Sequence, residues 1–246
     1  MGIRKIFGDD LTGVHVFTDF DGTLSNIVDV PSQAGPVEGV GRAVAALRDD
    51  GASVTVVSGR PVVFLRTHLG RLGVDLVGLY GLESDAYGET VRHPEAERWI
   101  PAIRSTTAAA AVRFEPGMVE AKGLSLTVHF RGRPEMAEQI ESWARETAER
   151  TGLEARPAKQ SIELHPPINF DKGSAVRERL DPLARGVVMI GDDVGDLPAY
   201  EALDEVGPDT THLKVVVKSS ELDGRVAAIA DLTLDSPDDV VAFLNC

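Results

Sequence analysis

The sequence predicts an α/β protein with a parallel sheet, into which a second, smaller α+β unit is inserted. Two observations carry this prediction. Apolar runs typical of buried strands, at 14–18, 53–57 and 187–190, end in polar residues and are followed by helical patterns, as in parallel sheets with right-handed crossovers. From about Glu95 to Pro167 the order changes to helix, strands, helix and strands, which indicates a separate α+β unit.

Composition and charge restrict the possible partners and compartments. The 246 residues suffice to bury a sizeable core. A formal net charge of −14 argues against nucleic acid or an anionic membrane surface as the main partner. No apolar run reaches the ~20 residues of a membrane helix, and the N-terminus does not resemble a signal peptide, so we expect a cytoplasmic protein. The single cysteine, Cys246, excludes an internal disulfide or a cysteine-ligated metal.

The first half of the predicted core alternates strand, helix and strand. After the strand at 14–18, residues 36–50 carry apolar side chains at helical spacing, and Gly51 follows as a stop signal. The runs 53–57 and 76–80 are again of the buried-strand type. Strands that alternate with helices in this way are expected to pair in parallel.

The inserted unit is predicted from four segments. Residues 99–112 are rich in alanine and helical in pattern, and residues 134–151 form a second helix with a polar face. Residues 119–131 alternate like one half-exposed antiparallel strand, and residues 153–165 indicate two short strands. The expected domain bounds are 95–167 for the inserted unit, and 1–94 with 168–246 for the core.

The second half of the core repeats the design of the first. Asp171 opens a helix, and the strand at 187–190 ends in Gly191 and two aspartates, before a helix that runs through Leu203. The remaining predicted elements are strands at 212–218 and 231–234 and a closing helix at 238–244.

Two aspartates stand at the carboxyl end of the first predicted strand. Because side chains alternate along a strand, Asp19 and Asp21 share one side, and we expect both carboxylates to point toward one place. Gly22 allows a tight turn there, and Thr23 adds a hydroxyl suited to a phosphate and cation site. Asp-Gly is also a common turn dipeptide, so the pair by itself is equally explained by a surface turn.

Three further segments favour an active site over a turn. Ser58 follows the second strand, and Lys172 stands at a predicted helix start. Asp192, Asp193 and Asp196 follow a third strand. The carboxyl ends of parallel strands meet at one edge of the sheet, where sites in open α/β proteins lie. Helix capping is the alternative function for the serine and for the last two aspartates.

In this order, the segment Asp19-Phe20-Asp21-Gly22-Thr23, Ser58, Lys172 and residues 191–196 resemble the four motifs of the haloacid dehalogenase-like phosphohydrolases. The resemblance implies a Rossmann-like core with a parallel sheet. It also implies four catalytic residues. Asp19 would attack phosphorus and Asp21 would serve as general acid and base. Ser58 would donate a hydrogen bond to the phosphoryl group, and Lys172 would place a positive charge against that group and Asp19.

Aspartates that converge require a cation. Two unit charges ~4 Å apart repel by roughly 4 kcal/mol at an effective dielectric of about 20. The resemblance implies Mg²⁺ held by Asp19, the backbone carbonyl of Asp21 and Asp192, the hard oxygen ligands that this ion prefers. Asp193 and Asp196 are candidates for orienting the metal ligands or the catalytic lysine.

The position of the inserted unit in the sequence indicates which group of these phosphohydrolases the chain resembles. It falls in the long gap between Ser58 and Lys172, that is, between the second and third motifs. A smaller α+β cap of type C2 at this place resembles that of the sugar phosphatases in the superfamily. Phosphomutases, a further alternative, mostly carry a helical cap between the first and second motifs.

Within that group the chain resembles the trehalose-6-phosphate phosphatase family. The segments that carry this resemblance are 57–61, 119–131, 162–166 and 169–173. We expect Thr23 to bind the substrate through its hydroxyl. The resemblance implies that six further polar residues bind it: Arg60, Glu120, Lys122, His129, Arg131 and Glu163. Without the resemblance, the better explanation of Lys122, His129 and Arg131 is the polar side of a half-exposed strand.

Two departures from the family pattern leave the sugar open. Residues 195–198 read Gly-Asp-Leu-Pro where many relatives have Thr-Asp-Glu, and His165 stands where an arginine often precedes the proline. The alternatives are a pseudo-disaccharide, sucrose or glyceryl glycoside phosphate as substrate, or a non-catalytic sugar-phosphate sensor. We expect a small sugar phosphate as the ligand, no nucleic acid or membrane partner, a separate synthase upstream and a monomer.

Overall fold

The computed structural model describes residues 1–28, 30–158, 160–219 and 222–246. It separates into two compact units. The core unit consists of Met1–Thr90 and Phe170–Cys246, and the inserted unit consists of Val91–Asn169. Each unit is described by itself.

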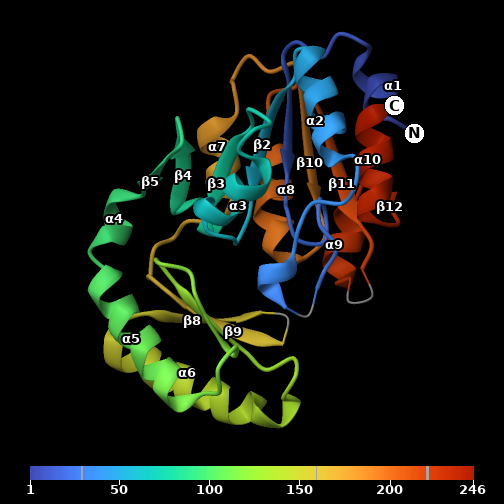
Figure 1. The fold of residues 1–246 in the computed structure, drawn as a ribbon. Helices are drawn as coiled ribbons and strands as arrows, with labels where there is room; N and C mark the ends of the chain where they lie inside the picture. Colours follow the sequence, from blue (N-terminus) through green and yellow to red (C-terminus); the bar gives the residue numbers. More distant parts are fainter. Residues whose placement is uncertain (29, 159, 220–221) are drawn as a thin grey trace. The chain divides into compact units, whose positions relative to one another are not determined.

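A twisted sheet forms the centre of the core unit (Figure 1). Among the described residues its strands run in the order β12-β11-β10-β1-β2-β3-β4-β5. The strands are β1 (Val14–Thr18), β2 (Ser53–Val57), β3 (Asp75–Gly78), β4 (Glu83–Ala86), β5 (Glu89–Arg92), β10 (Gly186–Gly191), β11 (Thr211–Val217) and β12 (Leu232–Leu234). The sheet is parallel from β12 to β3, as predicted, but β4 pairs antiparallel with β3. Strands β4 and β5 were not predicted, because both are short and largely polar.

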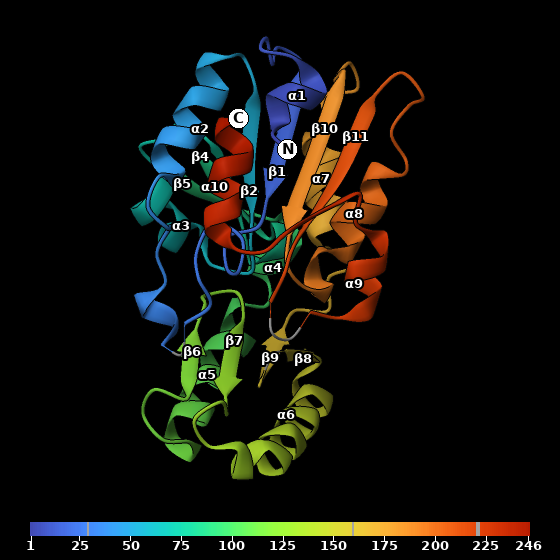
Figure 2. The ribbon, with the colours of Figure 1, turned by 90° about the vertical axis from the view of Figure 1, so that its right-hand side faces the viewer.

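Helices cover both faces of this sheet (Figure 2). One face packs against α1 (Ile3–Phe7), α2 (Val40–Asp49), α3 (Val62–Leu69) and α10 (Pro237–Asn245), and the other against α7 (Lys172–Arg179), α8 (Leu197–Leu203) and α9 (Gly224–Ile229). Neighbouring strand residues supply the two apolar layers: Val16 belongs to the first and Phe17 to the second. This alternation explains why the strands read as continuous apolar runs, since both of their sides are buried.

The inserted unit has an α+β fold of its own. Its sheet has the strand order β6-β7-β9-β8, with bounds β6 (Val119–Ala121), β7 (Leu126–His129), β8 (Glu154–Ala158) and β9 (Ser161–His165). The helices are α4 (Pro94–Glu97), α5 (Ile100–Arg113) and α6 (Ala137–Thr151). Leu126, Val128, Ile162 and Leu164 form an apolar core with residues of α5 and α6. The intervening strand residues therefore face the opposite, polar side.

The structure corrects two sequence-based boundaries. Residues 119–131 were expected to form one strand, but β6 and β7 are an antiparallel hairpin whose turn spans 122–125. Gly123, with φ +87°, sits in this turn, and its left-handed backbone interrupts the strand. The helix expected from residue 36 begins only at Val40, after Gly39 with φ +95°. None of the helices in the described ranges has the length and apolar character needed to cross a membrane.

Acidification below about pH 6.5 is expected to destabilise the core unit through His15. Burial lowers the pKa of His15 to about 4 from 6.5, against an opposing effect of Asp181, and its Nε2 lies 2.8 Å from Thr55 Oγ1. As the pH falls, His15 takes up a proton near pH 6.5 in the unfolded chain but only near pH 4 in the folded protein. The stabilising effect of neutral His15 is therefore complete above pH 6.5 and is lost toward pH 4. Its loss lowers the free energy of unfolding by roughly 3 kcal/mol. Urea unfolding across this window measures the effect. His15→Gln should flatten the curve, and an unchanged curve in that variant would contradict the assignment.

Candidate active site

Two neighbouring strands bring the first and fourth motifs together. β1 and β10 pair in parallel, with Thr18 opposite Ile190, so both strands end at one edge of the sheet. Asp19 follows β1, and its backbone N–H donates to the carbonyl of Ile190 at 2.8 Å. Asp192 follows β10 at the same edge, and both aspartates are buried. The pairing of β1 with β10 therefore places two carboxylates from distant parts of the chain side by side.

Lys172 lies between two of the carboxylates. It is the first residue of α7, which begins there because the Asp171 side chain caps it by accepting from the N–H of Ser174. The Lys172 Nζ lies 2.9 Å from Asp19 Oδ1 and 2.6 Å from Asp196 Oδ1, and the residue is 3% exposed. Burial alone would lower the pKa of Lys172, but these carboxylates outweigh it and hold the pKa well above its usual range. The two carboxylates therefore favour the charged ammonium form of this buried side chain.

Asp196 organises the loop after β10. Its Oδ1 accepts from Lys172, while its Oδ2 accepts from the backbone N–H groups of Asp192 at 2.9 Å and Asp193 at 3.1 Å. Asp193 instead accepts from the N–H of Gly195 and caps the 3₁₀ turn at 194–196. The sequence left both roles open for both aspartates. In the structure Asp193 is the capping residue, and Asp196 contacts the lysine.

The residues at this edge fit a divalent cation. Among the described residues, carboxylate oxygens of Asp19, Asp192 and Asp196 all lie within 4.8 Å of one another. Burial raises the pKa of the Asp19 carboxyl well above its usual range, with Lys172 opposing it and the neighbouring aspartates adding to it. One lysine against this many buried carboxylates leaves excess negative charge, which a hard cation with oxygen ligands would balance.

The carboxylate of Asp21 is not one of these three. β1 ends at Thr18, and Asp21 sits in a bridge to Ser25, so strand alternation does not extend to it. Its carboxylate is held by Arg60 through two hydrogen bonds of 2.7 Å each, one to each oxygen. A third Arg60 nitrogen donates to the carbonyl of Pro31 at 2.9 Å, and the guanidinium lies 4.6 Å from the centre of the Phe64 ring. The predicted substrate ligand Arg60 thus contacts the predicted general acid.

Ser58 and Thr23 contribute hydroxyls in the core unit. Ser58 follows β2 and is buried, and its Oγ accepts from the N–H of Arg60 at 3.2 Å. It does not cap α3, whose N-terminal capping position is Pro61. Thr23 is fully buried, and its Oγ1 has no hydrogen-bond partner in the described part of the chain. A buried hydroxyl without a partner is costly, and a bound phosphate oxygen would supply one.

The polar side of the inserted sheet collects the predicted cap residues. Glu120 Oε2 lies 2.9 Å from His129 Nε2. Glu163 Oε1 accepts from Ser125 Oγ at 2.6 Å and lies 3.5 Å from Lys122 Nζ. The predicted ligand Arg131 is half-buried just after β7. His165, which was not predicted as a ligand, is buried on β9. The hairpin turn is what brings Lys122 and Ser125 to the same carboxylate.

Residues 17–238 match the family model described as trehalose-phosphatase. The chain belongs to the trehalose-phosphatase family. A trehalose-phosphate phosphatase of Mycobacterium leprae (strain TN) is 33% identical over 254 residues, an alignment that covers 96% of this chain and 58% of that protein. The chain thus spans less than two thirds of the length of this curated relative.

Solved structures share the fold of this trehalose-phosphatase family member. A trehalose-6-phosphate phosphatase related protein matches with a TM-score of 0.76 and 24% identity, covering 94% of this chain and 95% of the other. A haloacid dehalogenase-like hydrolase from Bacteroides thetaiotaomicron matches with a TM-score of 0.62 and 16% identity, over 94% of this chain and 97% of the other. The predicted family and fold class are confirmed.

Charge divides unequally between the two units of this family member. Residues 91–169 contain 11 Lys and Arg against 11 Asp and Glu, whereas the core unit contains 14 against 28. The whole net charge of −14 therefore belongs to the unit that carries the aspartate cluster. This negative charge would repel a phosphate ester, so local positive charge such as that of Lys172 would be needed to bind one.

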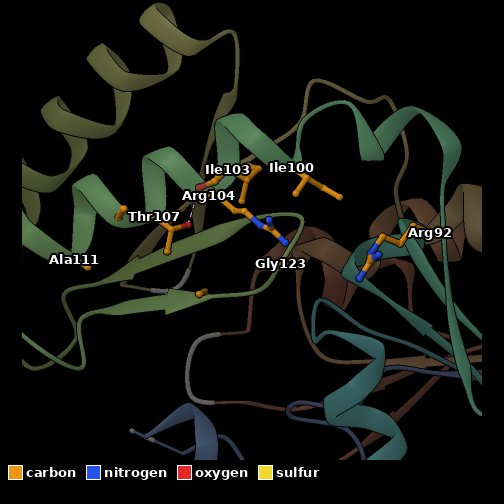
Figure 3. Close-up of a pocket in the computed structure, with 9 residues that line it drawn as sticks. Arg92, Ile100, Ile103, Arg104, Thr107, Ala111 and Gly123 are labelled. Atoms are coloured by element: carbon orange, nitrogen blue, oxygen red, sulfur yellow. Dashed lines mark hydrogen bonds between the residues drawn. The ribbon is translucent and has the colours of Figure 1, made fainter.

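A cavity within the inserted unit is separate from the polar face. It has a volume of about 380 Å³ and lies between α5 and the β6–β7 turn (Figure 3). Ile100 and Ile103 line it on α5, and Arg104 points toward Gly123 across it. None of the predicted substrate ligands is among its described lining residues. Its apolar walls belong to the helical side of the sheet, opposite the polar face.

Gly22→Ala is expected to impair both folding and the site. Gly22 has φ +78°, and a Cβ there would overlap the carboxylate of Asp192. We expect a loss of roughly 1–3 kcal/mol of stability together with a large fall in turnover. Gly8→Ala is the matched control, because Gly8 has φ +85° but open space around a Cβ. Thermal unfolding and phosphate release measure both effects. Equal behaviour of the two variants would contradict a role for the close approach at Gly22.

Proposed function

We propose that this chain hydrolyses trehalose 6-phosphate to trehalose and inorganic phosphate through an aspartyl-phosphate intermediate. The observation that carries the proposal is the buried arrangement of Asp19, Lys172 and Asp196, at the carboxyl edge of the core sheet in a trehalose-phosphatase family member. A nucleophile beside a fixed cation is the arrangement that phosphoryl transfer needs.

The reaction proceeds in two steps. Asp19 attacks phosphorus, the bond from phosphorus to the sugar oxygen breaks, and Asp21 gives its proton to that oxygen as trehalose leaves. Water then attacks the aspartyl phosphate, Asp21 takes a proton from this water, and the bond between phosphorus and the Asp19 oxygen breaks. Inorganic phosphate and the free carboxylate of Asp19 result, and Asp21 returns to its protonated form.

Neighbouring groups position the phosphoryl group and balance its charge. Lys172 supplies a fixed positive charge, and Ser58 and Thr23 supply hydroxyl donors for the phosphoryl oxygens. Mg²⁺ is the cation we propose for the acidic cluster, with Asp19, Asp192 and the backbone carbonyl of Asp21 as its ligands. When bound, it neutralises negative charge on the phosphoryl group. Asp196 and Asp193 hold the lysine and the loop in place.

The polar face of the inserted unit is proposed to recognise the sugar. Its predicted ligands combine carboxylate acceptors with cationic or imidazole donors, which suits a hydroxyl-rich ligand: Glu120, Lys122, His129, Arg131 and Glu163. We propose that the inserted unit sets substrate specificity, and that the synthase that supplies the substrate is a separate protein. The chain is proposed to act as a monomer.

Phosphate release from a panel of sugar phosphates in the presence of Mg²⁺ tests the proposal. We expect the highest kcat/KM with trehalose 6-phosphate and loss of turnover with a chelator, restored by Mg²⁺. Turnover of sucrose phosphate, a pseudo-disaccharide phosphate or a glyceryl glycoside phosphate, with none of trehalose 6-phosphate, would overturn the substrate. Tight binding without phosphate release would indicate a sensor, and isomerisation without phosphate release would indicate a phosphomutase.

Arg60→Ala is expected to lower kcat on the order of 10²-fold while KM changes little, because Arg60 holds both oxygens of the general acid Asp21. Arg60→Lys should rescue little, since lysine lacks the two-pronged geometry. Arg66→Ala is the matched control, because Arg66 on α3 pairs with Asp85 at 2.5 Å instead. Steady-state kinetics decide the matter. A raised KM with unchanged kcat would show that Arg60 binds substrate directly.

A further inference from the structure

Thr127 occupies the middle of the polar face of the inserted sheet, and no function has been assigned to it above. On the strand register it pairs with Glu120 of β6 on one side and with Glu163 of β9 on the other. The three side chains therefore form one row across adjacent strands, which lie about 4.8 Å apart. A hydroxyl is thus set between two carboxylates that are proposed to bind the sugar.

The hydroxyl of Thr127 is buried and has no hydrogen-bond partner among the described residues. The residue is 3% exposed, and its Oγ1 makes no hydrogen bond to any of the described residues. The flanking carboxylates already have other donors: Glu163 accepts from Ser125 and pairs with Lys122, and Glu120 pairs with His129. The network on this face is therefore arranged around Thr127 without including it.

Packing alone does not explain a threonine here. Valine has the same shape and a similar preference for strands, and it would avoid the cost of burying a hydroxyl without a partner. A hydroxyl that both donates and accepts is complementary to the hydroxyls of a sugar, which do the same. The cost in the free protein is recovered if a ligand supplies the missing hydrogen bond.

We propose that Thr127 is a specificity-determining residue whose Oγ1 hydrogen-bonds a hydroxyl group of the sugar portion of the substrate. This inference rests on the proposed function, because it presumes a sugar phosphate as the substrate. It adds a neutral contact between Glu120 and Glu163, so that the sugar is read by a carboxylate, a hydroxyl and a carboxylate in one row.

The test compares Thr127→Val with Thr127→Ser in the full chain. With trehalose 6-phosphate, Thr127→Val should raise KM by roughly 5- to 10-fold with kcat nearly unchanged, as expected for the loss of one hydrogen bond. Thr127→Ser should remain close to the wild type. With para-nitrophenyl phosphate, which has no sugar hydroxyls, all three proteins should behave alike. The melting temperature of Thr127→Val should be equal to that of the wild type or higher.

Thr107→Val is the matched control in the same unit. Thr107 lies on α5 beside the cavity, and its Oγ1 donates to the carbonyl of Ile103 at 2.8 Å (Figure 3). The same substitution there removes a hydroxyl from the helical side and should leave KM unchanged.

Two results would overturn the inference. An unchanged KM for the sugar phosphate in Thr127→Val would show that the hydroxyl makes no contact with it. A lower melting temperature of this variant would show that the hydroxyl stabilises the protein instead. Failure of the proposed function is seen separately, in the wild type, as phosphate release from another sugar phosphate only. The same comparison of variants is then made with that substrate and decides the inference.

Discussion

Asp19→Asn is expected to abolish phosphate release, with a fall in kcat of at least about 10⁴-fold, because it removes the nucleophile of a covalent mechanism. The amide has nearly the shape of the carboxylate, and Lys172 keeps its shorter contact of 2.6 Å to Asp196. The fold should therefore persist, as judged by circular dichroism and by an unfolding transition that remains cooperative. Rapid mixing with radiolabelled substrate should show phosphoprotein in the wild type and none in the variant.

The control for Asp19→Asn is Asp10→Asn. Asp10 is exposed in the loop before β1, where its carboxylate accepts only from the N–H of Thr12 among the bonds described for it. The same change of charge at this site should leave kcat unaffected. Appreciable turnover by Asp19→Asn, at a rate comparable to that of the control, would remove Asp19 from the role of nucleophile.

Lys172→Met is expected to produce the largest combined loss of stability and activity. It leaves Asp19 and Asp196 buried without their counter-charge, and breaking a buried ion pair in this way typically costs about 3–5 kcal/mol. Turnover should fall by roughly 10³-fold or more, since a fixed charge at the phosphoryl group is lost. Urea unfolding and phosphate release on the same preparations measure the two effects.

Lys214→Met distinguishes this effect from the loss of any lysine in the core unit. Lys214 on β11 is also buried, with 6% of its surface exposed. It pairs at 2.5 Å with Asp204, however, whose side chain is 55% exposed. Water can solvate that carboxylate after the substitution, so we expect a smaller loss of stability and normal turnover. If Lys172→Met were no less stable than Lys214→Met, the buried charges would not depend on Lys172.

The motifs at the strand ends were predictable because they follow from local pattern. Asp19 and Asp192 come directly after apolar runs that form β1 and β10, and parallel pairing makes such ends meet at one edge. Lys172 was predictable as a helix start, since Asp171 is a capping residue of the preferred type. These features depend on strand direction and on capping chemistry, both of which are encoded within a few residues.

Contacts made by loops were not predictable in the same way. Alternation suggested that Asp21 points with Asp19, but the strand ends at Thr18 and Arg60 holds the Asp21 carboxylate. Which of Asp193 and Asp196 caps the helical turn and which contacts Lys172 was also open, because both are aspartates close to the start of that turn. A signal for Thr127 did exist, since it shares the parity of His129 on β7, but its missing partner became visible only with the structure.

By itself, the sequence determined the fold class, the family resemblance and the residues from which a phosphoryl-transfer site could be built. The tertiary structure decided which of them meet: Asp196 at Lys172, Arg60 on Asp21, and Thr127 between Glu120 and Glu163. The physical reason is that periodicity specifies on which side of a strand or helix a residue lies, whereas side-chain partners depend on the path of the loops and on pairing between strands far apart in the chain.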